Sequence, residues 1–178
     1  MSDTVRTVNC MREARLGRRI DLERLHREIP KGKLYRGRPQ MLVVPTASGR
    51  NLQVFASGVI QIMGNVTHRT SLAMRDELLR HLRRLHPQLP TPTLTLKNLV
   101  ACAQLTNTVP LHHIKQSSAS ATYEPELFPA LLLRRFAPIH VAVFHTGKCV
   151  LTGLQSLDQA RDIMNVLSLY LENTSSLC

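Results

Sequence analysis

The chain has 178 residues, 43% of them apolar, and a formal net charge of +11 with a pI near 10.4. This apolar content suffices for a buried core and argues against a wholly disordered chain. No run approaches the 18 apolar residues of a membrane span and no secretory signal is visible, so we expect a soluble, intracellular protein without a membrane partner. Four scattered cysteines without a Cys-x-x-Cys pair predict reduced thiols and no zinc site.

The positive charge is concentrated in the first half of the chain. Residues 1–90 hold 17 Lys and Arg against 7 Asp and Glu, a net charge of +10. Residues 91–178 hold 6 against 5, a net charge of +1. A basic balance of this kind predicts a polyanion or an acidic protein as partner.

The first half opens with two short elements. The run VRTVNC at 5–10 predicts a strand, and IDLERLHREI at 20–29 predicts a helix. Asp21 is a candidate N-cap for this helix, and Pro30 ends it.

Two further elements complete the first half. The stretch VFASGVIQIMG at 54–64 predicts two strands joined by a tight turn at Gly58. A long helix from about Thr67 to His86 follows and is ended by Pro87, and the proline-rich run HPQLPTPT at 86–93 predicts a joint between the halves.

The second half repeats this series of elements. KNLVACAQL at 97–105 predicts a strand, and VPLHHIKQ at 109–116 predicts, more weakly, a short helix. VFHTGKCVLTG at 143–153 predicts a strand pair in which Phe144, Lys148, Val150 and Thr152 share one face. Ser156 and Gln159 form a capping box at the start of a last long helix.

The two glycine-marked strand pairs are related by a direct repeat. VFASGVIQIMG and VFHTGKCVLTG begin 89 residues apart, half the length of the chain. We therefore expect an α+β fold made of two direct repeats, 1–90 and 91–178, each with an antiparallel sheet that carries its helices on one side. The other sheet face stays open, and an open face of this size is typical of a binding surface.

Two segments of the second half carry a family resemblance. TYEPELFPALLLRR at 122–135, followed by VFHTGKCVLTG, resembles the TATA-box-binding protein family, and KNLVACA at 97–103 is similar to the start of that family's second repeat. The resemblance is strong over residues 96–172 and weak over 1–90. It implies a pseudo-symmetric saddle with a curved antiparallel sheet whose concave face rides the DNA minor groove, and with helices on the convex side. It also implies a general transcription initiation factor that acts in the nucleus, has no cofactor and is not an enzyme.

The resemblance also assigns a set of DNA-binding residues. TATA-binding protein is itself the standard example of a protein that inserts apolar wedges into the minor groove, so this mechanism is carried over with the family. A·T pairs offer only acceptors there, so a reader needs amide donors and a flat apolar surface. The resemblance implies Asn98 as the central amide, Phe128 and Phe144 as wedges, and phosphate contacts at Arg134 and Lys148. The remaining implied DNA contacts are Val100, Pro129, Val150, Thr152 and, in the first repeat, Phe55.

Protein partners are implied on two other surfaces. Glu124, Glu126 and Leu127 match the loop that a TFIIB-type factor grips in the family. The first long helix suits a TFIIA-type factor or an acidic regulator. Its candidate contacts are Arg75, Arg80, Arg83 and Arg84.

The first repeat departs from the family at its DNA-facing positions. The residue equivalent to Asn98 is expected beside TVRTV, where the sequence has Asp3, and about six extra residues are expected around MREARLG. A carboxylate there would face the groove's acceptors and repel them. The upstream wedge is missing, because the candidate positions hold Arg38, Pro39 or Gln40, and the Lys, Val and Thr of the reading strand are replaced by Val59, Gln61 and Met63. We therefore expect weaker binding, a one-sided bend and relaxed selectivity for TATA.

Two other classes of function compete with this interpretation. The first is a protein-interaction scaffold that keeps the fold and binds DNA weakly or not at all. The second is an enzyme, which the sequence does not favour. His112 and His113 point apart on a helix without a third ligand, and the other candidates lack a catalytic arrangement. These are Ser117, Ser118, Ser120, Asp158 and Asp162.

Overall fold

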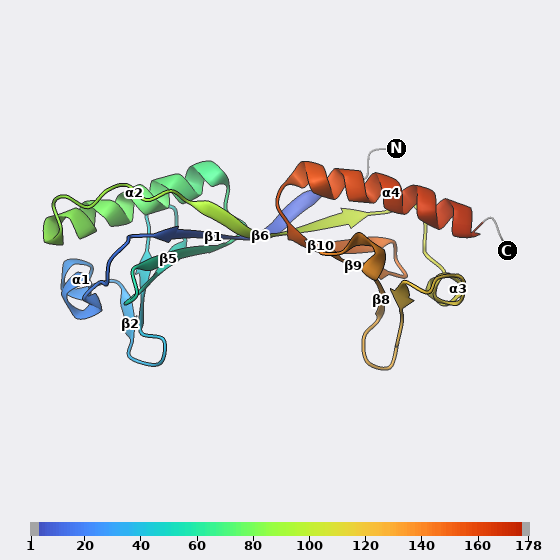
Figure 1. Cartoon of the computed structure of the whole chain (residues 1–178), viewed down its shortest axis with the longest axis horizontal. Helices are drawn as coiled ribbons and strands as arrows, with labels where there is room; N and C mark the ends of the chain where they lie inside the picture. The colour runs from blue at the N-terminus through green and yellow to red at the C-terminus, as the bar shows by residue number, and fades with distance from the viewer. Residues whose placement is uncertain (1–3, 176–178) are drawn as a thin grey trace. The chain divides into compact units, whose positions relative to one another are not determined.

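The structure is a computed structural model and describes residues 4–175 of the chain. It contains two compact units (Figure 1). One consists of residues 10–97, here called the 10–97 unit. The other consists of residues 98–175 together with residues 4–9 and is called the 98–175 unit.

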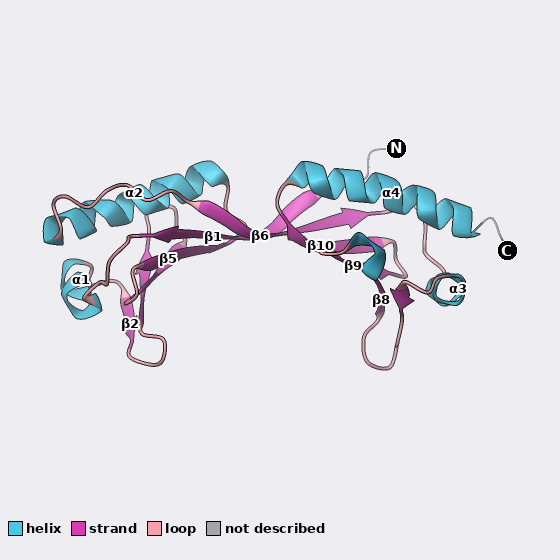
Figure 2. Ribbon diagram, in the orientation of Figure 1, coloured by secondary structure: helices cyan, strands magenta, loops and turns pink. Residues whose placement is uncertain are grey.

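In the 10–97 unit, a five-stranded antiparallel sheet has the order β2-β3-β4-β5-β1. Helix α2 runs along the face of strands β1 and β5 (Figures 1 and 2). In chain order the elements are β1 (Arg6–Arg15), α1 (Leu22–Glu28), β2 (Lys33–Tyr35), β3 (Met41–Pro45), β4 (Asn51–Phe55), β5 (Val59–Gly64) and α2 (His68–Leu85).

In the 98–175 unit, the sheet is again antiparallel and has the order β6-β10-β9-β8-β7. The elements are β6 (Thr95–Gln104), α3 (Leu111–Ser117), β7 (Ala121–Thr122), β8 (Ala130–Leu133), the 3-10 turn η1 (Arg134–Phe136), β9 (His140–Phe144), β10 (Lys148–Leu154) and α4 (Leu157–Ser175).

The two halves match element by element, which confirms the α+β class and the direct repeat. Strands β1 and β6 begin 89 residues apart, as do helices α1 and α3. The main-chain contact of Leu16 with Gly58 is repeated by Leu105 with Gly147 at the same offset.

The constant offset corrects one prediction about the first repeat. Strand β1 continues to Arg15, so MREAR belongs to the strand and the expectation of extra residues around it was wrong. Asp3 lies outside the described residues. At an offset of 89, the residue equivalent to Asn98 is Asn9, so the repeat has the same amide at both positions.

Alternation along the strands builds the core on the helix side of each sheet. In β5, Ile60 and Ile62 are fully buried, and in β10 Cys149 and Leu151 are fully buried. The intervening residues are half-buried or exposed, as expected for strands with one covered face. Burial of each large apolar side chain contributes about 1.5–3 kcal/mol relative to exposure.

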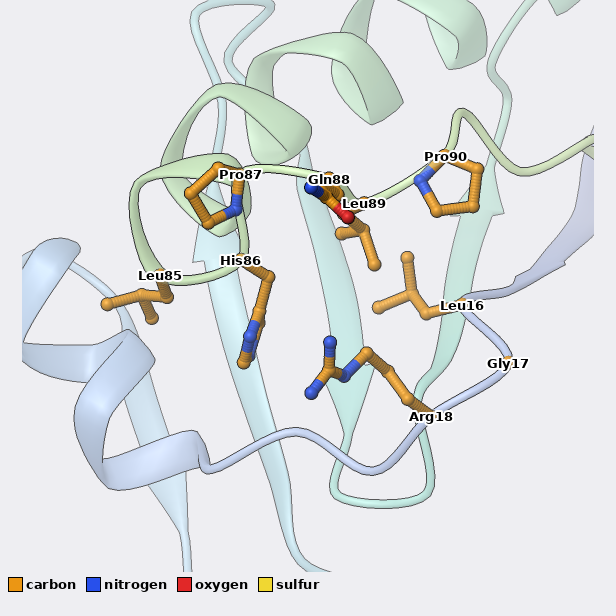
Figure 3. Close-up of a pocket in the computed structure, with 9 residues that line it drawn as sticks. All are labelled: Leu16, Gly17, Arg18, Leu85, His86, Pro87, Gln88, Leu89 and Pro90. Carbon is orange, nitrogen blue, oxygen red and sulfur yellow. The ribbon is translucent and has the colours of Figure 1, made fainter.

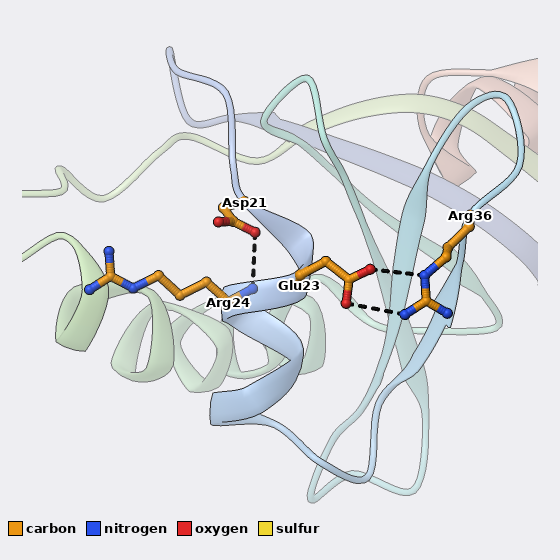
Figure 4. A network of polar contacts seen from close by, with 4 residues as sticks. All are labelled: Asp21, Glu23, Arg24 and Arg36. Atoms are coloured by element: carbon orange, nitrogen blue, oxygen red, sulfur yellow. Dashed lines mark hydrogen bonds and ion pairs between the residues drawn. The ribbon is translucent and has the colours of Figure 1, made fainter.

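Helix ends follow the predicted caps. Asp21 accepts a hydrogen bond from the Arg24 backbone N–H at 3.0 Å, and Ser156 accepts one from that of Gln159 at the same distance. In Figure 4, Glu23 of α1 pairs through both carboxylate oxygens with Arg36, at 2.9 and 3.2 Å. The hydrogen bond and the charge of Glu23 raise the pKa of Arg36 above its ordinary value.

The turn glycines are required by space as well as by backbone conformation. Gly58 has φ +86°, and a Cβ there would lie 1.9 Å from the Arg18 carbonyl oxygen. Gly147 has φ +81°, and its Cβ would lie 2.6 Å from the Asn107 oxygen. Any side chain would therefore push the neighbouring loop away from the strand turn.

A search of the chain between residues 4 and 175 finds no helix that is both long and apolar enough to cross a membrane.

Candidate nucleic-acid interface

The sheet of the 98–175 unit presents a mostly apolar face on the side opposite the buried core. Val150 of β10 stands between Cys102 of β6 and Ala142 of β9, and Thr152 stands between Val100 and His140. The alternation places all of these side chains on the less buried face. The face predicted for Phe144, Lys148, Val150 and Thr152 is confirmed.

Phe128 and Phe144 lie together on this face. Phe144 ends β9 opposite Ala130, and Phe128 stands two residues before Ala130 in the loop that precedes β8. The ring centroids are 6.0 Å apart with an interplanar angle of 66°, an edge-to-face pair. Phe128 keeps 45% of its surface exposed, so the pair is not part of the core beneath the helix.

Asn98 is held in one orientation by the backbone. The N–H of Gly153 donates to its Oδ1 at 3.0 Å, across the bulge that separates Thr152 and Leu154 in the β6–β10 ladder. Because the oxygen accepts this bond, the NH₂ group is directed away from it and can serve as a donor. The amide assigned to A·T recognition therefore has its donor end set by the fold.

The predicted phosphate contacts lie at the margins of the same sheet. Lys148 is exposed at the start of β10. Arg134 is exposed in η1, at the rim of a hollow of about 550 Å³ that Leu132 and Ile139 also line. Pro129 is exposed between Phe128 and β8.

The 10–97 unit carries a different set of aromatic residues on its open face. Phe55 of β4 is opposite Met41 of β3, which is opposite Tyr35 of β2, so the three form one row. Tyr35 is 38% exposed, and its position beside Phe55 was not recognised in the sequence. At an offset of 89, Phe128 corresponds to Pro39, so the position of the upstream wedge holds no aromatic ring.

Polar residues replace apolar ones at the centre of this open face. Gln61 of β5 lies opposite both Glu13 of β1 and Gln53 of β4, where the other unit has Val150, Cys102 and Ala142. Val59 and Met63 lie at the positions of Lys148 and Thr152. Glu13 and Gln53 were not singled out in the sequence, because only the strand pairing brings both of them beside Gln61.

The loop at 124–127 projects from the 98–175 unit. The backbone N–H groups of Leu127 and Phe128 both donate to the Glu124 carbonyl oxygen at 2.9 Å, which closes a tight turn. Leu127 is 81% exposed, and Glu124 and Glu126 are exposed as well. The turn therefore presents two exposed carboxylates followed by a large exposed apolar side chain.

The arginines of α2 differ in how free they are for a partner. The side chain of Arg75 is only 13% exposed and donates to the Pro92 carbonyl oxygen at 3.1 Å. Arg83 donates to the Leu89 oxygen at 3.2 Å and to Thr91 at 2.8 Å. Both tie the helix to the proline-rich segment that follows it, whereas Arg80 is exposed and Arg84 lies 3.6 Å from Glu28 at 67% exposure.

A pocket of about 640 Å³ lies where this proline-rich segment meets the loop after β1. Figure 3 shows that His86 and Arg18 reach into the same space from the two sides. Desolvation, reinforced by the charges of Arg18 and Arg24, lowers the pKa of His86 below its ordinary value. The pocket combines the Arg18 guanidinium with Leu16 and Leu89, and its residues belong to two loops and the end of α2 and not to the open sheet face.

The histidines and acids weighed as catalytic groups are not brought together. His112 packs edge-to-face on Tyr123, with ring centroids 4.9 Å apart. Within residues 4–175, no group of three His, Cys, Asp or Glu side chains could hold a metal ion.

Comparison with known proteins identifies the family. The model of the family "Transcription factor TFIID (or TATA-binding protein, TBP)" matches residues 93–173. A solved structure, Methanococcus jannaschii TBP, superposes with a TM-score of 0.78 at 26% identity, over 97% of this chain and 98% of that one. The family model, the full-length relatives and the solved structure together support a member of the TATA-box-binding protein family. The likeness in fold to that solved structure extends over both repeats, whereas the family model matches the second repeat alone.

TATA-box-binding protein relatives fall into long and short matches. The Methanococcus aeolicus protein is 28% identical over 163 residues, 90% of each chain, and TATA-box-binding protein 2 of Methanosarcina acetivorans is 26% identical over 99% of this chain and 100% of its own. TATA-box-binding protein-like 1 of Entamoeba histolytica is 38% identical over 80 residues, 42% of this chain and 37% of its own. The chain spans less than half of the length of the Pyrodictium occultum TATA-box-binding protein that it matches, 42%, at 34% identity.

Proposed function

We propose that the chain is a general transcription initiation factor that binds promoter DNA in the minor groove and bends it. Phe128 and Phe144 insert between base pairs, and Asn98 donates to A·T acceptors beside the apolar surface of Val100 and Val150. Thr152, Pro129 and Phe55 extend this contact, and Arg134 and Lys148 meet phosphates. The bent DNA then nucleates a pre-initiation complex in the nucleus.

The observation that carries this proposal is the exposed aromatic pair. The rings of Phe128 and Phe144 are in edge contact on the open face of the sheet, and Phe128 is 45% exposed. Such exposed rings are unusual in a fold that buries its apolar side chains under helices on the other face. A wedge must be exposed before binding and must be supported from below, and Ala130 and the β8–β9 ladder give that support.

The bend is expected to be one-sided. The 98–175 unit has two rings at its wedge positions, whereas the 10–97 unit has Phe55 beside Pro39. Each unstacked base step costs a few kcal/mol, and a single ring opens a step less effectively than a pair. We therefore expect a shallower bend and weaker discrimination of TATA where the 10–97 unit binds.

Protein partners are proposed on the surfaces that DNA leaves free. The 124–127 turn, which exposes Leu127 together with Glu124 and Glu126, suits a basic and apolar groove of a TFIIB-type factor. Arg80 and Arg84 of α2 are available to a TFIIA-type factor or an acidic regulator. Arg75 and Arg83 support this surface through their contacts with residues 89–92.

A protein-interaction scaffold is the second candidate. It is favoured by Glu13, whose carboxylate lies on the open face where DNA acceptors would approach. Such a scaffold would use the same fold and the 124–127 turn, and would have no need of exposed rings.

The test measures fluorescence anisotropy of a labelled TATA-containing duplex with the wild-type chain, Phe128→Ala and Phe144→Ala. Each variant is expected to lose at least about 10-fold in affinity, because the lost wedge is worth more than about 1.4 kcal/mol. Leu169→Ala, which truncates a 62% exposed apolar residue on α4, is the matched control and should bind as the wild type does. Equal affinities for all four proteins would exclude wedging and favour the scaffold.

A further inference from the structure

Glu13 occupies an unusual position in strand β1. Its neighbours Arg12 and Ala14 face the buried side, and Arg12 bonds there to the Val66 oxygen at 2.9 Å. Glu13 therefore faces the open side of the sheet, where it lies opposite Gln61. It is nevertheless only 8% exposed, so its carboxylate is enclosed by its neighbours on a face that no helix covers.

The carboxylate of Glu13 retains unused acceptor capacity. Its Oε1 is buried and has no hydrogen-bond donor in proper geometry within the described part of the chain. The Arg15 guanidinium lies 2.8 Å away as an ion pair, with the arginine side chain 72% exposed. This ion pair offsets the negative charge of Glu13, but no aligned N–H donates to the lone pairs of Oε1. An enclosed acceptor without a donor favours a ligand that donates a hydrogen bond.

Glu13 is the first member of a polar row. Gln61 of β5 lies directly opposite Glu13 on one side and opposite Gln53 of β4 on the other. Directly opposed side chains in antiparallel strands have Cβ atoms about 4.5–5.5 Å apart, so one carboxylate and two carboxamides lie within reach of one ligand. The row crosses three strands of the 10–97 unit.

The equivalent row in the other unit is apolar. Cys102, Val150 and Ala142 occupy the same positions and pair in the same register. An apolar row tolerates A·T pairs and leaves the amino group of guanine without an acceptor. The two units thus present opposite chemistry at equivalent places.

We propose that the row of Glu13, Gln61 and Gln53 reads the exocyclic N2 amino group of guanine, so that the DNA segment bound by the 10–97 unit contains a G·C pair. In the minor groove A·T and T·A show acceptors only, and guanine adds the single donor. A carboxylate can only accept, so guanine is the base that it satisfies. Gln61 can accept from the same group or donate to guanine N3. This inference rests on the proposed function.

Inosine gives a direct test, because it lacks only the N2 amino group of guanine. The probe is an A·T-only duplex core, with single G·C pairs introduced at each position in turn and a matched series with I·C pairs. The wild-type chain is expected to bind at least one G·C duplex about 5-fold or more tightly than both its I·C partner and the A·T duplex. Equal binding of G·C and I·C duplexes at every position would overturn the inference.

The variants connect this preference to the row. Glu13→Val should abolish the difference between G·C and I·C while binding to the A·T duplex is kept or improved. Leu169→Ala, which truncates an exposed apolar residue on α4 outside both sheet faces, is the control and should leave the preference unchanged. Gln61→Val gives a second test if Glu13→Val fails to fold by thermal melting, and it should reduce the preference at the same base pair. If Glu13→Val or Gln61→Val folds and still prefers the G·C duplex over the I·C duplex, the inference is overturned.

The outcomes also separate this inference from the function on which it rests. Binding of the A·T duplex that depends on Phe128, with no effect of the guanine amino group, overturns guanine reading alone. If neither the A·T duplex nor any G·C duplex binds, the proposed function fails as well.

Discussion

The two repeats differ mainly on one side of their sheets. Toward the helices, Ile60 and Ile62 correspond to Cys149 and Leu151, and all four are fully buried. Toward the open side, Gln61 corresponds to Val150. Burial requires apolar character but not one particular residue, so the core stays apolar through these substitutions, whereas the open face is less constrained by packing.

This difference teaches that binding chemistry can diverge within one fold while the scaffold stays intact. Arg12 is an exception in the core, where it occupies the position of Ala101 and is satisfied by the Val66 oxygen and by Cys10 Sγ at 2.8 Å. A buried guanidinium with such partners is tolerated because its donors are used. We expect the two open faces to differ in how they bend DNA and in how their affinity depends on salt.

The largest effect is expected from giving the 10–97 unit a second ring. Pro39→Phe places an aromatic residue at the position equivalent to Phe128, beside Phe55, and should add a kink of about 20–40° to bound TATA DNA. Fluorescence transfer between dyes at the duplex ends measures this bend. The double variant Pro39→Phe with Phe55→Ala is the control and should lose the added kink. A wild-type chain that already shows two full kinks would contradict the one-sided bend.

A smaller effect is expected from the charge on the reading strand. Lys148→Ala should reduce the slope of log affinity against log salt by about 0.9, since one phosphate contact is lost. Val59→Lys, at the equivalent position in the other repeat, should steepen the slope by about the same amount. Titrations between 50 and 200 mM salt would then differ by about 3-fold per charge. Parallel slopes for the three proteins would show that neither position meets a phosphate.

The smallest effect concerns stability and pH. The pKa of His86 is lowered in the folded chain by desolvation and then by Arg18 and Arg24, so the unfolded chain binds more protons below the ordinary histidine value of about 6.5. Stability should therefore fall as the pH drops from 7 toward 5. His86→Gln should flatten this fall in Tm slightly, and Arg18→Gln should do so less. Thermal melts across this range that are identical for all three proteins would contradict the assignment.

Much of the fold could be predicted because its signals are local. Gly58 and Gly147 mark turns that demand positive φ, and Asp21 and Ser156 are caps that bond as expected. The 89-residue offset between the glycine-marked strand pairs already gives the repeat. Such features depend on neighbours in sequence, and no tertiary contact overrides them.

The position of the first central amide could not be predicted in the same way. The family resemblance is weak over residues 1–90, where the equivalent of Asn98 was expected at Asp3 instead of Asn9. The charged run MREAR, around which extra residues were expected, belongs to strand β1. The structure shows why the charges are compatible with a strand, since Arg12 is satisfied beneath the helix and Glu13 is paired with Arg15. Only long-range contacts between β1, β5 and α2 supply that information.

The arginines of α2 show the same limit. Their spacing indicates a solvated helix face, and Arg80 fits it. Arg75 and Arg83 instead hold the segment around Pro92 and Leu89. Helical periodicity cannot show that a following loop folds back over the helix.

The way in which the chain divides has a consequence for how base preference can be inherited. The 10–97 unit is one uninterrupted length of chain, whereas its counterpart is assembled from residues 4–9 and 98–175. A single replacement between Cys10 and Lys97 would therefore exchange the whole row of Glu13, Gln61 and Gln53 and leave residues 4–9 and 98–175 in place. Recombination within such a gene could therefore change the promoter sequence that a factor prefers in one step, by exchange of one contiguous segment instead of stepwise substitutions.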